Sequence, residues 1–123
     1  MLVNSIKFNG DNYVLELTRG DTAILEFRFV DDDGQPSDLS NFEILMTAKE
    51  WTNDADAESK FQLEPFEHED ADLCNGIVYF KIRPENTKTL EYKKYSFDVQ
   101  IKDGDDIWTP IVAYLMVKKE IKF

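Results

Sequence analysis

The fold is decided by residues 95–106, which read YSFDVQIKDGDD. Apolar side chains alternate with polar ones from Tyr95 to Lys102, and this period of two predicts a strand with one apolar and one polar face. An Asp-Gly pair follows, which is typical of a tight hairpin turn. Residues 107–117 are rich in apolar and β-branched side chains and predict the second strand of the hairpin, with more of both faces covered.

The same alternation extends into earlier parts of the chain. It recurs in residues 13–18, 23–29 and 42–49, and residues 77–82 form a shorter and more continuously apolar run. Each of these segments predicts a strand, and turn-forming residues separate them. Short strands with turns roughly every 8–12 residues are typical of a sandwich of two antiparallel sheets. We therefore expect an all-β fold.

Two local signals interrupt the strands. Residues 84–91 break the alternation, and Asn86 or Thr87 is expected to cap one helical turn there. Near the start of the chain, Gly20 is expected to permit a sharp bend. The neighbouring Asp21 is expected to accept backbone hydrogen bonds where the chain passes from one sheet to the other.

Length and charge limit the classes of function. A chain of 123 residues, 42% of them hydrophobic, fits one domain with a core, so residues 1–123 are expected to form a single domain. The net charge of −11 argues against binding to nucleic acid and against docking to an anionic membrane. The longest apolar run, residues 111–117, is far shorter than the roughly 20 residues that span a bilayer, and the start lacks the features of a signal peptide. We expect synthesis in the cytoplasm.

Residues 51–75 differ from the rest of the chain in composition. They hold eight acidic residues and one lysine, so this segment carries −7 of the total charge of −11. Within it, residues 60–64 alternate and predict a short edge strand. The remainder is predicted to be a solvated excursion between strands, since the entropy of closing a loop grows slowly with its length.

Catalytic and metal-binding patterns are weak. The single cysteine, Cys74, excludes an internal disulfide, and the only histidine, His68, lies among carboxylates and is expected to be solvated. No acidic run has the spacing of an EF-hand calcium loop, which leaves only a looser calcium site between loops. The sequence also lacks a nucleophile elbow and a glycine-rich phosphate loop. We expect no enzyme activity, no cofactor and no metal.

Two tryptophans fall outside the cleanest alternation. Trp51 ends a predicted strand beside the acidic segment, and Trp108 follows the predicted hairpin turn. Each either anchors a protein partner or stacks on a sugar, or it covers one end of the core. The acidic segment is a further candidate for binding a partner. Its residues of interest are Glu67, Glu69, Asp70 and Asp72.

The order of these features resembles small immunoglobulin-like β-sandwich proteins of tailed bacteriophages and prophages. That group includes the N-terminal domain of baseplate upper proteins and related neck or tail components. The resemblance covers residues 12–118, and its most specific part is the YSFDVQ strand at residues 95–100 with the Asp-Gly turn after it. Members often have a small residue where Tyr114 stands, and the acidic segment around His68 has no counterpart. The other motifs, in order, are RGDT at 19–22, DGQPSDLS at 33–40, GIVYFKI at 76–82 and NT at 86–87.

The resemblance implies an immunoglobulin-like antiparallel β-sandwich of about seven strands, with an acidic excursion at residues 51–75. It also implies a non-enzymatic structural role in a tail, baseplate or neck, first in the host cytoplasm and then in the virion. The expected partners are other tail proteins or copies of the chain itself, contacted through edge strands and exposed aromatic side chains. A carbohydrate-binding or adhesion module that uses Trp51 or Trp108 as a stacking platform is the alternative function.

Overall fold

Eight strands and two short helical turns make up the part of the chain that the computed structural model describes, residues 2–7, 14–50 and 59–119. The strands are β1 (Leu2–Lys7), β2 (Val14–Thr18), β3 (Ala23–Arg28), β4 (Glu43–Glu50), β5 (Ser59–Leu63), β6 (Ile77–Ile82), β7 (Lys94–Asp103) and β8 (Asp106–Lys118). The helical turns are η1 (Leu73–Asn75) and α1 (Pro84–Thr87). Every predicted strand is present, the short edge strand included, whereas β1 is a strand that the sequence pattern did not predict.

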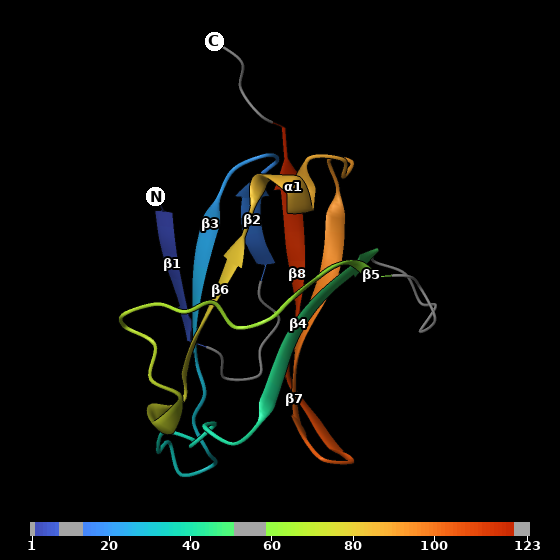
Figure 1. Cartoon of the computed structure of the whole chain (residues 1–123). Coiled ribbons are helices and arrows are strands. Elements are labelled where there is room, and N and C mark those ends of the chain that lie inside the picture. The colour runs from blue at the N-terminus through green and yellow to red at the C-terminus, as the bar shows by residue number, and fades with distance from the viewer. Residues whose placement is uncertain (1, 8–13, 51–58, 120–123) are drawn as a thin grey trace.

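The strands form two facing sheets (Figure 1). One sheet has the order β1-β3-β6 and the other has the order β2-β8-β7-β4-β5. The predicted immunoglobulin-like β-sandwich is therefore confirmed. Most neighbours are antiparallel as predicted, but β1 pairs with β3 and β2 pairs with β8 in parallel. The chain passes from β1 to β2 in the other sheet and then returns to form β3. β1 and β3 are therefore neighbours that run in the same direction.

A hydrogen bond joins the connection between β2 and β3 to the helical turn α1. The N–H of Gly20 donates a hydrogen bond to the hydroxyl of the buried Thr87 at 2.9 Å. The N-cap residue of that turn is Arg83 and not Asn86 or Thr87, but Asn86 does take part in the cap through a capping box. Asn86 accepts a hydrogen bond from the Arg83 N–H at 2.7 Å. The Asp21 N–H donates a hydrogen bond to Thr18 O at 3.1 Å, and the prediction that Asp21 accepts backbone hydrogen bonds stays a prediction.

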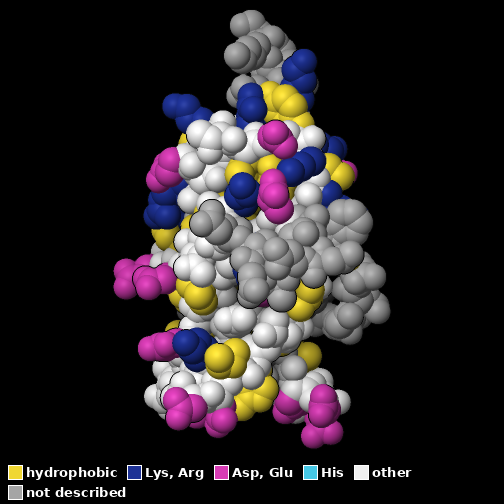
Figure 2. Space-filling view, turned by 90° about the vertical axis from the view of Figure 1, so that its right-hand side faces the viewer, with side chains coloured by type: hydrophobic (Ala, Val, Ile, Leu, Met, Phe, Trp, Pro, Cys, Tyr) yellow, Lys and Arg dark blue, Asp and Glu magenta, His cyan; other side chains and the backbone are white. Residues whose placement is uncertain are grey.

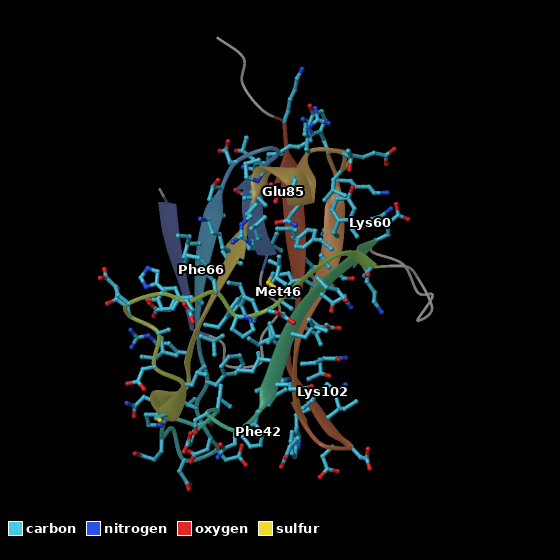
Figure 3. The ribbon with its side chains drawn as sticks, in the orientation of Figure 1. Phe42, Met46, Lys60, Phe66, Glu85 and Lys102 are labelled. Carbon is cyan, nitrogen blue, oxygen red and sulfur yellow. The ribbon has the colours of Figure 1, made fainter. Side chains whose placement is uncertain are left out.

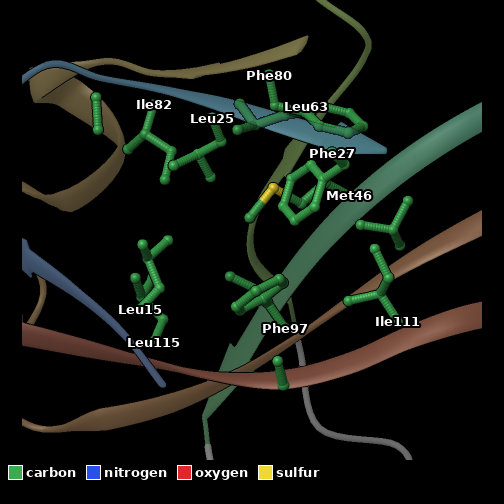
Figure 4. Close-up of a cluster of buried hydrophobic side chains, with 14 of the residues drawn as sticks. Leu15, Leu25, Phe27, Met46, Leu63, Phe80, Ile82, Phe97, Ile111 and Leu115 are labelled. Atoms are coloured by element: carbon green, nitrogen blue, oxygen red, sulfur yellow. The ribbon is translucent and has the colours of Figure 1, made fainter. Parts of the chain in front are cut away.

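The core lies between the inner faces of the two sheets. Phe27 of β3 is fully buried, with its ring 5.7 Å from that of Phe80 and 6.3 Å from that of Phe97 (Figure 4). Alternate residues of the neighbouring strands, such as Met46 and Leu115, complete the layer. The period of two in the sequence therefore marks the faces that are buried.

One strand departs from the expected burial. β8 was predicted to have more of both faces covered, but Ile107 is 55% exposed and Val112 is 63% exposed. The prediction is wrong for this strand because, within the described residues, no third layer covers the outer face of the five-stranded sheet. It is right for β6, where Tyr79 is buried on the outer face of the three-stranded sheet.

Tyr79 is buried because the connection between β5 and η1 folds back onto its sheet. The N–H of Phe66 donates to Tyr79 O at 2.6 Å, and the ring of His68 stacks on the ring of Tyr79 at 4.1 Å between centroids. The side chain of His68 is only 19% exposed, so the prediction of a solvated histidine is wrong. The Phe66 backbone and the His68 ring hold this connection against the sandwich, while the acidic side chains between residues 64 and 72 remain exposed.

The outer face of the three-stranded sheet holds a buried ionic group. The Tyr79 hydroxyl and the Arg28 guanidinium both donate hydrogen bonds to the carboxylate of the buried Glu26. Burial, and then the hydrogen bond to Glu26, raises the pKa of Tyr79 to about 12. The neutral phenol is therefore the form that the folded state favours.

This raised pKa predicts a loss of stability in alkali. An unfolded tyrosine loses its proton near pH 10, whereas folded Tyr79 keeps it to about pH 12. The unfolded state then binds fewer protons, so the free energy of unfolding should fall as the pH rises from about 10 to about 12. Urea unfolding at several pH values should show a shallower fall for Tyr79→Phe than for the unaltered chain. Equal pH slopes for the two proteins would contradict the raised pKa of Tyr79 in the folded state.

Candidate functional site

The turn between β7 and β8 carries the candidate site. Gly104 and Asp105 form a two-residue loop, and Asp103 pairs with Asp106 on either side of it. Gly104 has a φ of 61°, which fits a hairpin turn with glycine in its first position. The predicted hairpin is confirmed, and it extends beyond the start of β4 at the lower end of the five-stranded sheet (Figure 1).

A β-bulge determines where Trp108 points. Val99 pairs with Ile111 and Ile101 pairs with Trp108, so β8 has one residue more than β7 between these pairs. A bulge reverses the order of inward and outward side chains beyond it. Trp108 therefore lies on the same side of the sheet as the buried Ile101, and its neighbour Ile107 lies on the outer side.

Trp108 covers one end of the core, which is one of the alternatives predicted for it. Its ring meets the ring of Phe42 edge-on at 6.1 Å, and Phe42 packs against the core, so Trp108 covers one end of the sandwich. Half of its surface nevertheless remains exposed. Figure 3 shows Phe42 and Lys102 at this same end. We refer to Phe42, Ile107, Trp108 and Pro110 as the hairpin-end patch.

The edge of β8 beside this patch lacks a neighbouring strand within the described residues. β2 pairs with β8 only over Tyr114–Lys118, so residues 106–113 extend beyond it. Pro110 lies in this stretch, as expected for proline, which lacks an N–H and is found on sheet edges or at bulges. Exposed strand edges are sites where another chain adds by backbone hydrogen bonding.

The turns at this end of the sandwich are acidic. Seven exposed aspartates belong to the connection between β3 and β4 or to the β7–β8 hairpin, which are far apart in the sequence. Figure 2 shows acidic side chains at the lower end, and most of the Lys and Arg side chains, with further acidic ones, toward the upper end. Within the described part of the chain, none of the seven forms an ion pair, whereas Lys93 and Lys118 at the other end pair with Glu50 and Glu16. We call these aspartates the acidic rim. They are Asp31, Asp32, Asp33, Asp38, Asp103, Asp105 and Asp106.

Local hydrogen bonds explain why aspartate occupies two of these positions. The Asp31 carboxylate accepts hydrogen bonds from the N–H groups of Asp33 and Gln35, both at 2.9 Å. The Ser40 hydroxyl and N–H both donate to Asp38 and hold its pKa below the usual range. These hydrogen bonds stabilise the turns. At these two positions the negative charge of this end therefore comes from side chains that also shape the turns.

The structure separates the residues that were predicted to bind a partner. Trp108 lies at the hairpin, and Trp51 lies outside the described residues. The four acidic candidates are exposed, but they lie in the connection that crosses to the three-stranded sheet, away from the hairpin (Figure 1). Asp72 also has a local role, because it accepts a hydrogen bond from Asn75 Nδ2 at 2.7 Å. The four residues are Glu67, Glu69, Asp70 and Asp72.

A second region of the surface has two hollows, which are lined by both acidic and basic side chains. Two adjoining hollows of about 550 and 490 Å³ flank the end of β5 and share Leu45, Glu64 and Pro65 in their walls. They also contain Lys81 and Lys102, so both signs of charge are present. Several of the exposed side chains around them are charged, such as Glu64 and Arg83, whereas Trp108 and Ile107 are exposed apolar side chains. The hairpin end is therefore the stronger candidate for a contact surface.

Three further observations concern metal ions, disulfides and membranes. Among the described residues, no group of three or more His, Cys, Asp or Glu side chains is placed to hold a metal ion. Cys74 is exposed and forms no disulfide. None of the helices in the described ranges is long and apolar enough to cross a bilayer.

Comparison with known proteins finds a shared fold. No protein-family model matches the sequence, and no curated protein matches it. Among solved structures, the N-terminal domain of ORF48 of phage TP901-1 is similar, with a TM-score of 0.58 and 14% identity over 97% of this chain and 100% of that one. The cysteine protease inhibitor EhICP2 from Entamoeba histolytica has a TM-score of 0.49 and 8% identity, covering 95% and 96%. The Lin-41 filamin domain has a TM-score of 0.41 and 13% identity, covering 81% of each chain.

Proposed function

We propose that this chain is a non-enzymatic structural module of a phage tail, baseplate or neck, and that it acts through contacts with other proteins of the particle. The observation that carries the proposal is the likeness to the phage TP901-1 domain, which extends over nearly the whole of both chains. At 14% identity that likeness shows the fold alone, so the surface of this chain must supply the rest of the argument.

The hairpin end supports a role in assembly. Trp108 and Ile107 are each about half exposed, and they lie beside a strand edge that has no neighbour within the described residues. Aromatic side chains are enriched at protein interfaces and often dominate their binding energy. Unpaired backbone groups on such an edge form hydrogen bonds with a strand of another chain when the two assemble.

A search for the chain in phage particles tests the proposal. Particles purified from a host strain that carries the gene should contain the chain, in a fixed ratio to other tail proteins, when their proteins are measured by mass spectrometry. Tail genes on both sides of this gene would agree with that result. Particles that lack the chain would contradict the proposal.

A glycan array separates this proposal from the carbohydrate-binding alternative. We expect no specific sugar binding, because the Trp108 ring already packs against Phe42 and covers one end of the core. Strong binding to one sugar that disappears in Trp108→Ala would overturn the assembly role in favour of an adhesion module.

A further inference from the structure

We infer that residues 106–113 of β8 receive an extended, Lys- or Arg-rich segment of a partner protein as an added strand. The inference rests on the proposed function, since it names the chemistry of the partner that an assembly module would meet at this edge. Three properties of the edge lead to it: the direction of its backbone groups, the side chains on its two faces, and the charge around it.

Within the part of the chain that the structure describes, the backbone of β8 has hydrogen-bonding groups along this stretch that face no neighbouring strand. Asp103 and Asp106 close the two-residue turn, so the backbone of Asp106 faces β7 and that of Ile107 faces away from it. Alternation then turns the backbone of Thr109 away from β7 as well. Beyond the bulge, Val117 N–H donates to Lys93 O on the β7 side, which places the backbone of Val112 on the side of β2. Within the described residues, β2 pairs with β8 no further than Tyr114.

The side chains favour a partner strand with apolar residues at alternate positions. Trp108 and Phe42 lie on the inner side of the edge, and Ile107 lies on its outer side. An added strand would therefore meet an exposed aromatic ring on one face and an exposed aliphatic side chain on the other. In such strand addition the backbone supplies affinity, and alternate side chains supply specificity.

The acidic rim selects a basic partner. Seven exposed aspartates lie at this end, and Lys102 of β7 is the residue that pairs with Ile107. Lys or Arg side chains on the polar positions of the added strand would neutralise this charge and speed its association. A second copy of the chain is disfavoured at this edge, because pairing two such ends would place two acidic rims side by side.

A peptide titration tests the inference on the full chain. Two synthetic decapeptides, one of alternating Lys and Val and one of alternating Glu and Val, are added to ¹⁵N-labelled protein. The Lys-Val peptide should shift the amide signals of Ile107, Thr109 and Val112, and the Glu-Val peptide should leave them unchanged. Binding should weaken as salt is added, because the attraction is between exposed charges.

Matched variants show whether the acidic rim is the cause. The double variant Asp105→Asn, Asp106→Asn should bind the Lys-Val peptide about tenfold more weakly, which corresponds to about 1.4 kcal/mol. The control, Asp21→Asn with Glu85→Gln, removes the same charge from exposed residues at the opposite end and should bind as the unaltered chain does. The inference is overturned if neither peptide shifts the edge amides, if both do so equally, or if the control loses as much affinity.

The two proposals can fail separately. A chain that is present in particles but does not bind the Lys-Val peptide keeps its assembly role and loses this contact. A chain that binds the peptide but is absent from particles keeps the edge site and loses the assembly role.

Discussion

Replacing Phe27 by alanine should lower the free energy of unfolding by about 3–5 kcal/mol, the range found when a buried phenylalanine is cut back to Ala. Phe27 is fully buried near the end of β3 and packs against Phe80 of its own sheet and Phe97 of the other (Figure 4). The loss combines the removed apolar surface with the cavity left between two sheets that cannot collapse onto it. Urea unfolding, monitored by circular dichroism, measures this loss of stability.

The matched control is another apolar truncation on the surface. Ile107→Ala removes an aliphatic side chain that is 55% exposed and should change stability by about 0.5 kcal/mol or less. If Phe27→Ala costs no more than this surface change, the two sheets do not meet at Phe27. A large loss in Ile107→Ala would instead show that the hairpin end belongs to the folding core.

Gly76→Ala should destabilise the protein by about 2–4 kcal/mol, through left-handed backbone strain and a steric clash. Gly76 has a φ of 72° at the end of η1, and a Cβ there would lie 2.5 Å from Phe29 O and 2.9 Å from Ser37 O. Gly76 O also accepts a hydrogen bond from Phe29 N–H at 2.9 Å. The clash would therefore push apart the two connections that meet at the acidic end.

Gly34→Ala separates the cost of left-handed backbone strain from the cost of the steric clash. Gly34 has a similar φ of 79°, but a Cβ there meets nothing within 4 Å. Its substitution should cost only the left-handed strain, about 1–2 kcal/mol. Equal losses for Gly34→Ala and Gly76→Ala in the same unfolding experiment would show that Gly76 is not in close contact with Phe29.

The strands and the hairpin could be predicted because their signals are local. Alternation and an Asp-Gly turn lie within one short stretch, so β7 and β8 follow from the chain itself. β1 was missed because Leu2–Lys7 has no clear alternation and pairs with β3, a strand beyond β2 in the chain. The parallel pairing of β2 with β8 was missed for the same reason, since it joins the two ends of the chain.

The candidate site could be predicted only in part. The sequence indicated Trp108 from its place after the hairpin turn, but the bulge that aims it at Phe42 depends on the register of two strands. The acidic rim also escaped prediction, because its aspartates come from turns 60 or more residues apart. A signal did exist: each Asp-rich turn follows a strand, and antiparallel strands bring their turns to the ends of a sandwich. His68 was misplaced because its stacking on Tyr79 is a contact between segments.

Photocross-linking in assembled particles tests most directly the claim that this chain is an assembly module that acts through its hairpin end. A photoreactive phenylalanine analogue would replace Ile107 in one variant and Lys88, an exposed residue at the opposite end, in another. We predict cross-links from position 107 to a Lys- or Arg-rich segment of a second particle protein. Cross-links from position 88 with none from position 107, or no cross-link from either, would contradict the account.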